Sequence, residues 1–406
     1  MTSPTGLGRL LVFVDEPFWR SGGAISTDRA FILFVQALVP SFNRLVLLGR
    51  VHPEPASKPY PCAPRADAEF HELPYYGSLY TPLSFLGALW RSLRVAWHAV
   101  ARSDVLLLGI PHPLALPMWV MGAIRRRPVI FLVRQDLLGR VRLRSSRVRR
   151  ALAVLFARTL EGLCILLARR TLTFTVGEAM FRRYHSPGAP VHSLLISLIR
   201  TDSLLDSVAR HLPPPGAERR LLWVGRLDPD KGLEILLECV RILLARHTIP
   251  LHLDLVGTGA LEEELRRQVR TMGLHERVTL RGYLAFGPQL EALYRNATVF
   301  VLPSNESEGF PQVVIESLAV GLPIVSTAVA GIPFLLRDGV HGLLVPPRNP
   351  RALAGAVERV LTDPELYLRL SASGLDLARQ HTLEAEREKM LARISRHLAR
   401  SHPRRS

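Results

Sequence analysis

The chain has 406 residues, of which 48% are hydrophobic, and a formal net charge of +17. This composition excludes a disordered or fibrous chain and predicts a globular protein of two or three domains. Cys62, Cys164 and Cys239 are scattered and lack metal-ligand spacing, so we expect buried thiols in a reducing cytosol and no disulfide framework. Residues 1–9 are polar, and the first apolar run has only the length of a strand, which argues against a signal peptide.

Apolar runs in the first half alternate between strand and helix periods. Such alternation predicts a parallel sheet wound by helices. The predicted elements are a strand at 10–15, a helix at 26–38, a strand at 44–49, a Pro-rich loop at 53–64, a helix at 83–101, and strands at 104–109 and 128–133.

The window 105–124 contains 20 residues without a formal charge, which is long enough for a membrane helix. Three prolines, at 111, 113 and 117, interrupt it, and His112 lies within it. We therefore expect a buried strand that leads into a buried helix. His112 then follows a strand end, where it could face a ligand, but a structural histidine is the favoured interpretation.

Much of the net charge lies in one segment. Residues 122–183 contain fifteen arginines and three acids, Asp136, Glu161 and Glu178, which is a surplus of 15 − 3 = 12. Apolar residues at helical spacing within 140–170 predict an amphipathic helix, which fits an anionic membrane surface. The alternative is a core-packing helix with a solvated basic face. Because no aromatic-interleaved binding motif accompanies the arginines, we do not expect nucleic acid as a partner.

Gly22 and Gly23 follow the first strand, at a junction with a helix. Glycines there let the backbone approach a phosphate or an acceptor, although a lone pair of glycines is weak evidence. Arg20 is either an acceptor contact or a solvated cation.

The segment 213–218, PPPGAE, is the predicted linker. Beyond it, the apolar runs LLWVG, LHLDLVG, VTL, TVFVL, PIVST and GLLV predict a second wound sheet. The predicted domains are residues 1–205, a linker at 206–218, a second domain at 219–382, and a closing helix with a basic tail at 383–406.

Gly225 breaks the strand that begins at Leu221, and Arg226 and Lys231 flank the break before a helix begins. Cations at the carboxyl end of a parallel strand lie where open α/β sheets bind ligands, and they would suit a diphosphate. The alternative is an ordinary turn with two solvated charges.

Glu308 and Glu316 flank the start of a helix predicted at 311–320, which begins at Pro311 and is followed by Gly321 and Pro323. The unpaired amides of this helix would form an anion pocket, and carboxylates beside it would bind hydroxyls. A ligand that is part phosphate and part sugar fits. The alternative is a surface loop whose acids favour a helix N-terminus.

Together these motifs resemble family 4 retaining glycosyltransferases. The resemblance is dense from about 221 to 347 and includes Gly225, Arg226, Lys231 and Gly232, then Val256, Gly257 and Gly259, then Glu308, Gly309, Phe310 and Pro311, with Glu316 eight residues after Glu308. It implies the GT-B fold, in which two Rossmann-like, doubly wound parallel-sheet domains face a cleft. Residues 1–205 would then be the acceptor side, residues 219–382 would bind the nucleotide sugar, and the helix and basic tail at 383–406 would return to the first domain.

The resemblance also implies roles. Arg226 and Lys231 would neutralise the donor diphosphate, Glu308 would hold donor-sugar hydroxyls, and Glu316 would hold the ribose. Gly22 and Gly23 match the glycine-rich loop of the family, and the helix N-terminus at Gly309, Phe310 and Pro311 would face the phosphates.

The acceptor side departs from the family pattern. Gln135 stands where relatives often have histidine, which puts any role of an imidazole in doubt, and Gly177 replaces a serine. The segment ISLIRTD replaces an Asn-Gly stretch.

We therefore expect a retaining hexosyltransferase-type enzyme that moves a sugar from a UDP- or GDP-linked donor to a carbohydrate or lipid-linked acceptor, in cell-envelope polysaccharide or glycolipid assembly. The alternatives are a nucleotide-sugar-binding pseudoenzyme, a phosphorylase or epimerase on the same fold, and a structural membrane-surface protein. The resemblance implies that no metal is required, since relatives with this fold commonly work without one, and Asp363 suits a helix start. The expected location is the cytoplasm, with peripheral contact at the inner face of the membrane.

Overall fold

The structure, a computed structural model, describes residues 7–21, 24–27, 29–52, 60–62, 68–75, 82–134, 137–138, 147–204, 210–246, 250–305 and 312–401. The chain forms two compact units. The first contains Met1–Ile196 and Glu386–Ser406, and the second contains Ser197–Ala385. The limits expected from the sequence are residues 205, 219 and 383.

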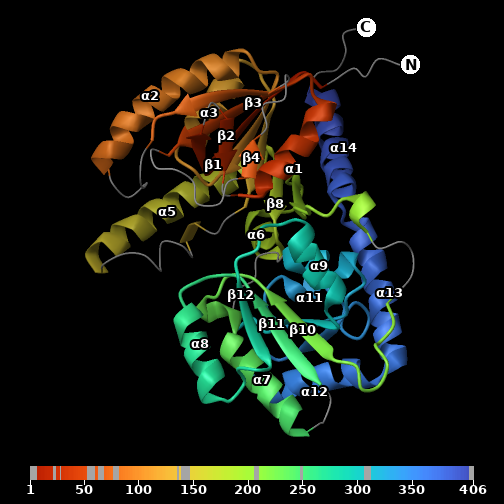
Figure 1. Cartoon of the computed structure of the whole chain (residues 1–406). Helices are drawn as coiled ribbons and strands as arrows, with labels where there is room; N and C mark the ends of the chain where they lie inside the picture. The colour runs from red at the N-terminus through yellow and green to blue at the C-terminus, as the bar shows by residue number, and fades with distance from the viewer. Residues whose placement is uncertain are drawn as a thin grey trace. The chain divides into compact units, whose positions relative to one another are not determined.

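A nine-stranded sheet lies at the centre of the first unit (Figure 1). Its order is β4-β2-β1-β6-β7-β8-β9, and β3 pairs with both β1 and β5. The strands are β1 (Arg9–Ser21), β2 (Ala24–Thr27), β3 (Arg44–Val51), β4 (Tyr60–Cys62), β5 (Ala68–Leu73), β6 (Val105–Ile110), β7 (Val129–Val133), β8 (Leu172–Val176) and β9 (Val191–Leu194).

Two predictions for the first unit are wrong in part. The predicted helix at 26–38 begins only at Phe31, because Ala24–Thr27 forms β2, and the predicted loop at 53–64 contains β4. Both short strands pair antiparallel, β2 with the end of β1 and β4 with β2, so the sheet is not wholly parallel. The β-branched side chains of Ile25 and Thr27 favour this extended backbone.

Helices of the first unit bury apolar side chains against the sheet. One core joins residues of β1, β3, β6 and β7 to residues of α2, α3 and α5, and it includes the buried Cys164. The helices are α1 (Phe31–Leu38), η1 (Val39–Ser41), α2 (Pro82–Ala101), α3 (Ala115–Ile124), α5 (Arg147–Ala168), α6 (Glu178–Tyr184) and, from Glu386 on, α14 (Leu383–Ser401). Residues 105–124 form the strand and the helix that the sequence predicts, β6 and α3. None of the described helices is both long and apolar enough to cross a bilayer.

The second unit has a six-stranded parallel sheet, β10 (Arg219–Val224), β11 (Leu251–Val256), β12 (Val278–Gly282), β13 (Val299–Leu302), β14 (Ile324–Thr327) and β15 (Leu343–Val345). Helix α12 packs on α7, and α10 packs on α13. The helices are η2 (Thr201–Ser203), η3 (Pro229–Lys231), α7 (Leu233–Arg246), α8 (Glu262–Thr271), α9 (Pro288–Asn296), α10 (Gln312–Ala319), α11 (Ile332–Leu335), α12 (Pro350–Thr362) and α13 (Pro364–Gln380). Asp363 caps α13 by accepting a hydrogen bond from the Leu366 amide at 2.9 Å, as predicted.

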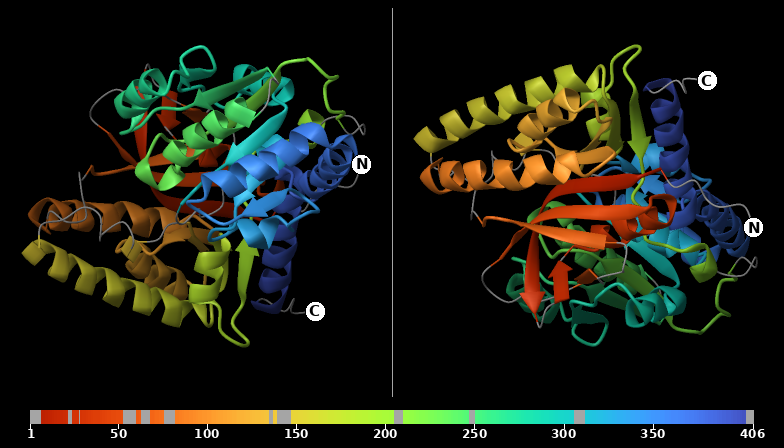
Figure 2. Two further views of the ribbon diagram at one scale, coloured as in Figure 1. Left: turned by 90° about the horizontal axis from the view of Figure 1, so that it is seen from below. Right: turned by 90° about the horizontal axis from the view of Figure 1, so that it is seen from above.

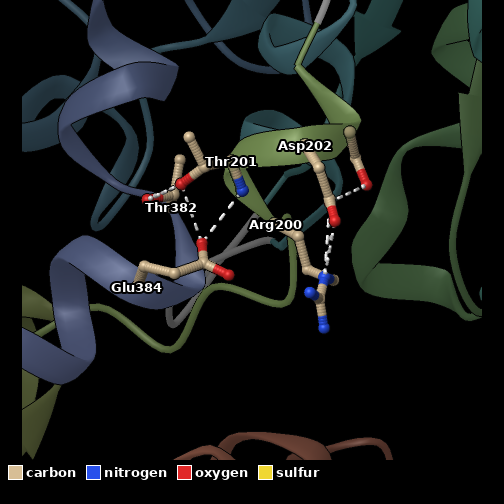
Figure 3. Close-up of polar contacts among 6 residues, drawn as sticks. Arg200, Thr201, Asp202, Thr382 and Glu384 are labelled. Atoms are coloured by element: carbon tan, nitrogen blue, oxygen red, sulfur yellow. Dashed lines mark hydrogen bonds and ion pairs between the residues drawn. The ribbon is translucent and has the colours of Figure 1, made fainter.

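Two distant segments of the chain are joined by hydrogen bonds near the limits of the second unit (Figure 3). The amide and hydroxyl of Thr201 both donate to Glu384 Oε2 at 2.9 Å. The Leu383 amide donates to the Ile199 carbonyl at 2.7 Å. The segment after β9 is thus fixed to the start of α14.

The loops after β10 and β11 are in direct backbone contact. The Gly225 amide donates to the Val256 carbonyl at 3.0 Å, and the Leu227 amide donates to the Thr258 carbonyl at 3.1 Å. Gly257 has φ +139°, and a Cβ atom there would lie 1.7 Å from the Gly225 carbonyl oxygen. Only glycine fits this position, because any side chain would push the two loops apart.

We expect Gly257→Ala to lower the free energy of unfolding by about 2 kcal/mol or more, through steric overlap and an unfavourable φ. The midpoint of thermal unfolding measures this effect. The control is Gly355→Ala in α12, where no atom lies within 4 Å of the added Cβ. Alanine there should stabilise the helix by up to about 1 kcal/mol. Equal midpoints for the two variants would contradict the close contact.

Candidate functional site

The strand order of the second unit determines which loops lie together. In the order β12-β11-β10-β13-β14-β15, the direction of progress along the sheet reverses between β10 and β13. Open parallel sheets bind ligands at the carboxyl ends of the strands that flank such a reversal. The loops after β10 and β13 therefore flank the candidate site, and both contain residues selected from the sequence.

Arg226 and Lys231 lie in the loop between β10 and α7. The Arg226 side chain is 75% exposed and its Nη1 lies 2.5 Å from Asp228 Oδ2. The Lys231 side chain is only 12% exposed, and its Nζ lies 3.1 Å from Asp230 Oδ2. An exposed ion pair contributes little free energy, so Arg226 can exchange Asp228 for a ligand phosphate at small cost. Lys231 is held more firmly, and its charge is less screened by water.

The segment that leads into α10 contacts this loop directly. The Asn305 amide donates to the Asp230 carbonyl at 2.9 Å, and Asn305 Nδ2 donates to Glu234 Oε1 at 3.0 Å. Gly232 has φ +65°, and a Cβ atom on it would lie 2.1 Å from the Pro303 carbonyl oxygen. The structure therefore brings the backbone next to Lys231 against the end of β13.

The predicted site residues Gly22, Gly23, Glu308, Gly309, Phe310 and Pro311 lie outside the described residues, so their placement stays a prediction. Helix α10, Gln312–Ala319, lies within the predicted helix at 311–320. Gly321 ends it with φ +65°, and its amide donates to the Leu318 carbonyl at 2.9 Å.

Glu316 is buried on α10 and pairs with a residue that the sequence analysis did not select. Tyr294 of α9 donates its hydroxyl hydrogen to Glu316 Oε2 at 2.8 Å. Burial raises the pKa of the Glu316 carboxyl to about 7, although the Tyr294 hydrogen bond opposes the rise. Burial and the adjacent carboxylate also raise the pKa of Tyr294. Tyr294 follows α9's apolar spacing, and no signal in the sequence indicates its partner.

Charged side chains also meet in the first unit, just beyond the last parallel pair of β1 with β6, which joins Phe13 and Leu108. Arg134, after β7, pairs with the buried Glu16 of β1 and lies over the Phe31 ring, with its Cζ 3.5 Å from the ring centre. Arg50 of β3 lies 2.5 Å from Asp15 of β1. Asp15, Glu16 and Arg50 were not selected from the sequence, although charges near the ends of apolar strands are the signal that could have found them.

His112 joins this cluster from the loop after β6. Its Nδ1 accepts a hydrogen bond from the Leu114 amide at 3.1 Å, and its Nε2 lies 3.6 Å from Asp15 Oδ1. Burial lowers the pKa of the imidazole against the opposing effect of Asp15. This agrees with the structural interpretation of His112. Arg20 is exposed and pairs with Glu72 at 3.2 Å, as a solvated cation would.

No group of three or more His, Cys, Asp or Glu side chains that could hold a metal ion occurs among the residues that the structure describes. The described part of the candidate site contains the cations Arg226 and Lys231 and loop backbone, and we expect Glu316 of α10 to contribute a buried carboxyl. Such a set can bind an anion and hydroxyl groups.

Residues 218–363 match the family described as glycosyl transferases, group 1. The chain is 30% identical over 224 residues to the alpha-D-kanosaminyltransferase of Streptomyces kanamyceticus. The aligned residues cover 53% of this chain and 56% of that enzyme. It is 33% identical over 187 residues to the amylovoran biosynthesis glycosyltransferase AmsK of Erwinia amylovora. These residues cover 44% of this chain and 42% of AmsK. The chain thus spans about half the length of these curated relatives.

The fold matches over nearly the whole chain. The crystal structure of HepE from Anabaena in complex with UDP and glucose superposes with a TM-score of 0.64, covering 95% of this chain and 99% of HepE at 17% identity. The predicted fold class, two Rossmann-like α/β units of the GT-B type, is confirmed by this likeness and by the two strand orders.

We expect Glu316 to make stability depend on pH. Because its pKa is about 7 in the folded chain and 4.5 ordinarily, the folded state binds more protons between these values. The free energy of unfolding then falls as pH rises from about 4.5 to about 7, by about 3 kcal/mol in total. Thermal unfolding of the wild type and of Glu316→Gln across this range measures the contribution.

The Glu316→Gln variant should lose this part of the pH dependence. The control is Glu238→Gln, which removes a half-buried carboxylate of α7 that pairs with Arg241. If wild type and Glu316→Gln changed in parallel with pH, the assignment of the raised pKa to Glu316 would be wrong.

Proposed function

We propose that this chain, which belongs to the group 1 glycosyl transferase family through residues 218–363, transfers a sugar from a nucleotide diphosphate sugar to an acceptor hydroxyl with retention of the anomeric configuration. One observation carries the proposal. Lys231, little exposed, lies beside the backbone contact between Gly232 and Pro303, at the reversal point of the six-stranded sheet. This is where a parallel sheet binds a phosphorylated ligand.

The main task of the site would be to stabilise the leaving diphosphate. As the bond from the sugar to the diphosphate breaks, negative charge grows on the phosphate oxygens. Arg226, Lys231 and the amides at the start of α10 would stabilise that charge, and preorganised groups of this kind often dominate enzymatic rates. Glu308 would orient the sugar through its hydroxyls.

Glu316 would hold the ribose. A carboxyl with a pKa of about 7 is only partly ionised near neutral pH. Ribose hydroxyls that donate to it would favour its ionised form, because hydrogen bonds to a carboxylate lower its pKa. Binding of the nucleotide would therefore release part of a proton.

A UDP-linked hexose is the first donor to test, because HepE, which has the same fold, binds UDP and glucose. A GDP-linked sugar is the other candidate. AmsK acts in amylovoran biosynthesis, and this supports an acceptor in polysaccharide or glycolipid assembly for the present chain. The Arg-rich segment 122–183 supports work at the inner surface of a membrane that carries a lipid-linked acceptor.

Lys231→Ala should lower donor hydrolysis or transfer about 100-fold or more, because a charge facing the leaving diphosphate is lost. Lys231→Arg should also be impaired. The Lys231 side chain is only 12% exposed in a tight loop, and the larger guanidinium group does not fit in the space that it occupies. Glu308→Ala should lose turnover as well. The measurement is kcat and KM with UDP-glucose, GDP-linked sugars and their free nucleotides.

Arg241→Ala is the matched control, because it removes one exposed positive charge from the adjacent helix α7. It should keep activity within about twofold. Normal turnover in both Lys231→Ala and Glu308→Ala would refute the mechanism. Binding of a nucleotide diphosphate by the wild type without any turnover would instead identify a binding protein.

A further inference from the structure

Exposed apolar side chains are concentrated on three helices of the first unit. Of the twelve large hydrophobic residues that are exposed in the described parts of the chain, eight lie on α2, α3 and α5. They are Trp90, Trp97, Val120, Ile124, Leu155, Phe156, Leu163 and Leu166. Scattered exposed hydrophobics need no explanation, but a concentration on neighbouring elements marks an interaction surface.

The three helices form one layer on the sheet. All three contribute to the same core, and α3 packs on α2. Trp119 of α3 donates its indole hydrogen to Thr171, just after α5, at 3.3 Å. Both views of Figure 2 show α2, α3 and α5, in orange to olive, lying along one another on one side of the sheet. We call their outward side the α2–α3–α5 face.

Helix α5 has two apolar sides. Its inner side buries Ala157, Leu160 and Cys164 in the core. Its outer side exposes Leu155 (62%) and Leu166 (56%), which lie eleven residues, or three turns, apart. A helix that only packs on a core would place polar residues there.

Helix α2 repeats this arrangement with tryptophan. Trp90 (66% exposed) and Trp97 lie two turns apart, with the exposed Arg94 between them. The Arg125 guanidinium, at the end of α3, lies 4.2 Å from the centre of a Trp97 ring. Tryptophan beside arginine is typical of side chains that lie at the boundary between lipid headgroups and acyl chains.

The charge of the layer is almost wholly positive. Residues 82–102, 115–127 and 147–170 contain twelve arginines and a single acid, Glu161. Glu161 is buried and pairs with Arg183 at 3.0 Å, so it does not offset the outward charge. A second copy of this face would be repelled, and an anionic surface would be attracted.

We propose that the α2–α3–α5 face docks on a bilayer of anionic phospholipid, with Trp90, Leu155 and Leu166 entering the headgroup region and the arginines contacting phosphates. This inference rests on the membrane location proposed above, but it assigns the membrane contact to a different set of residues. The expected segment 122–183 contains α5 but omits α2, which supplies both tryptophans. The residues of the face all belong to the first unit.

Flotation of the full chain with vesicles tests the proposal. Vesicles of phosphatidylcholine with about 30% phosphatidylglycerol should carry the chain, vesicles of phosphatidylcholine alone should bind at least about tenfold less, and salt near 0.5 M should weaken binding. The fluorescence of the wild type should shift to the blue on binding, and Trp90→Phe should reduce that shift. Equal binding to both vesicle types, or to neither, would overturn the proposal.

Two pairs of variants separate this face from the charge of the chain as a whole. Arg91→Glu, Arg158→Glu and Arg170→Glu together should lower binding about tenfold or more, whereas Arg270→Glu, Arg351→Glu and Arg369→Glu, which make the same charge change in the second unit, should lower it far less. Leu155→Ser with Leu166→Ser should weaken binding, and Leu368→Ser should not. Equal effects within either pair would refute the assigned face.

Donor hydrolysis without vesicles distinguishes this inference from the proposed catalysis. All surface variants should hydrolyse the donor at the wild-type rate, which also shows that they fold. Lys231→Ala should bind vesicles as the wild type does and yet lose turnover. Loss of vesicle binding in Lys231→Ala would mean that the second unit takes part in docking, which would contradict the inference.

Discussion

The candidate site depends on backbone atoms of three loops packing without side chains between them. Gly257 lies against the Gly225 carbonyl, and Gly232 lies against the Pro303 carbonyl, so the loop after β10 contacts both the loop after β11 and the loop after β13. This contact fixes the path of the chain through Arg226 and Lys231. A larger residue at either glycine would overlap a carbonyl oxygen and would displace the loop that holds the cations. The arrangement thus places rigidity at the carboxyl ends of the strands, where the ligand chemistry is expected.

Charges at the strand ends are balanced within the protein. Arg226 and Lys231 have Asp228 and Asp230 as partners, and in the first unit Arg134 has Glu16. Such pairs keep cations oriented, and those near solvent can be exchanged for a ligand at small cost. Glu316 differs, because it is buried with Tyr294 as its only neutral hydrogen-bond donor among the described residues, and its pKa rises accordingly. The second unit therefore combines cations held by acids with a buried carboxyl whose pKa is raised.

The two units use positive charge in different ways. In the second unit, cations lie one by one beside acids in a loop. In the first, arginines lie on the outer side of three helices beside exposed tryptophan and leucine, and the single acid of these helices is buried. The basic, apolar surface of the first unit suits a bilayer, and the loop cations of the second unit suit a diphosphate. A transferase with both would take its donor from solution and meet its acceptor at the membrane surface.

The sequence by itself determined the alternation of strands and helices, the strand-to-helix break at Gly225, the helix that follows Pro311 and the cap at Asp363, because each depends on local spacing and backbone preference. It missed β2 and β4, whose few residues form strands only through pairing, β2 with β1 and β4 with β2. Only the tertiary structure decided that Tyr294 meets Glu316, that Asp15 meets Arg50, and that the tryptophans of α2 share a face with the leucines of α5. These contacts join residues distant in the chain, and local spacing carries no information about them.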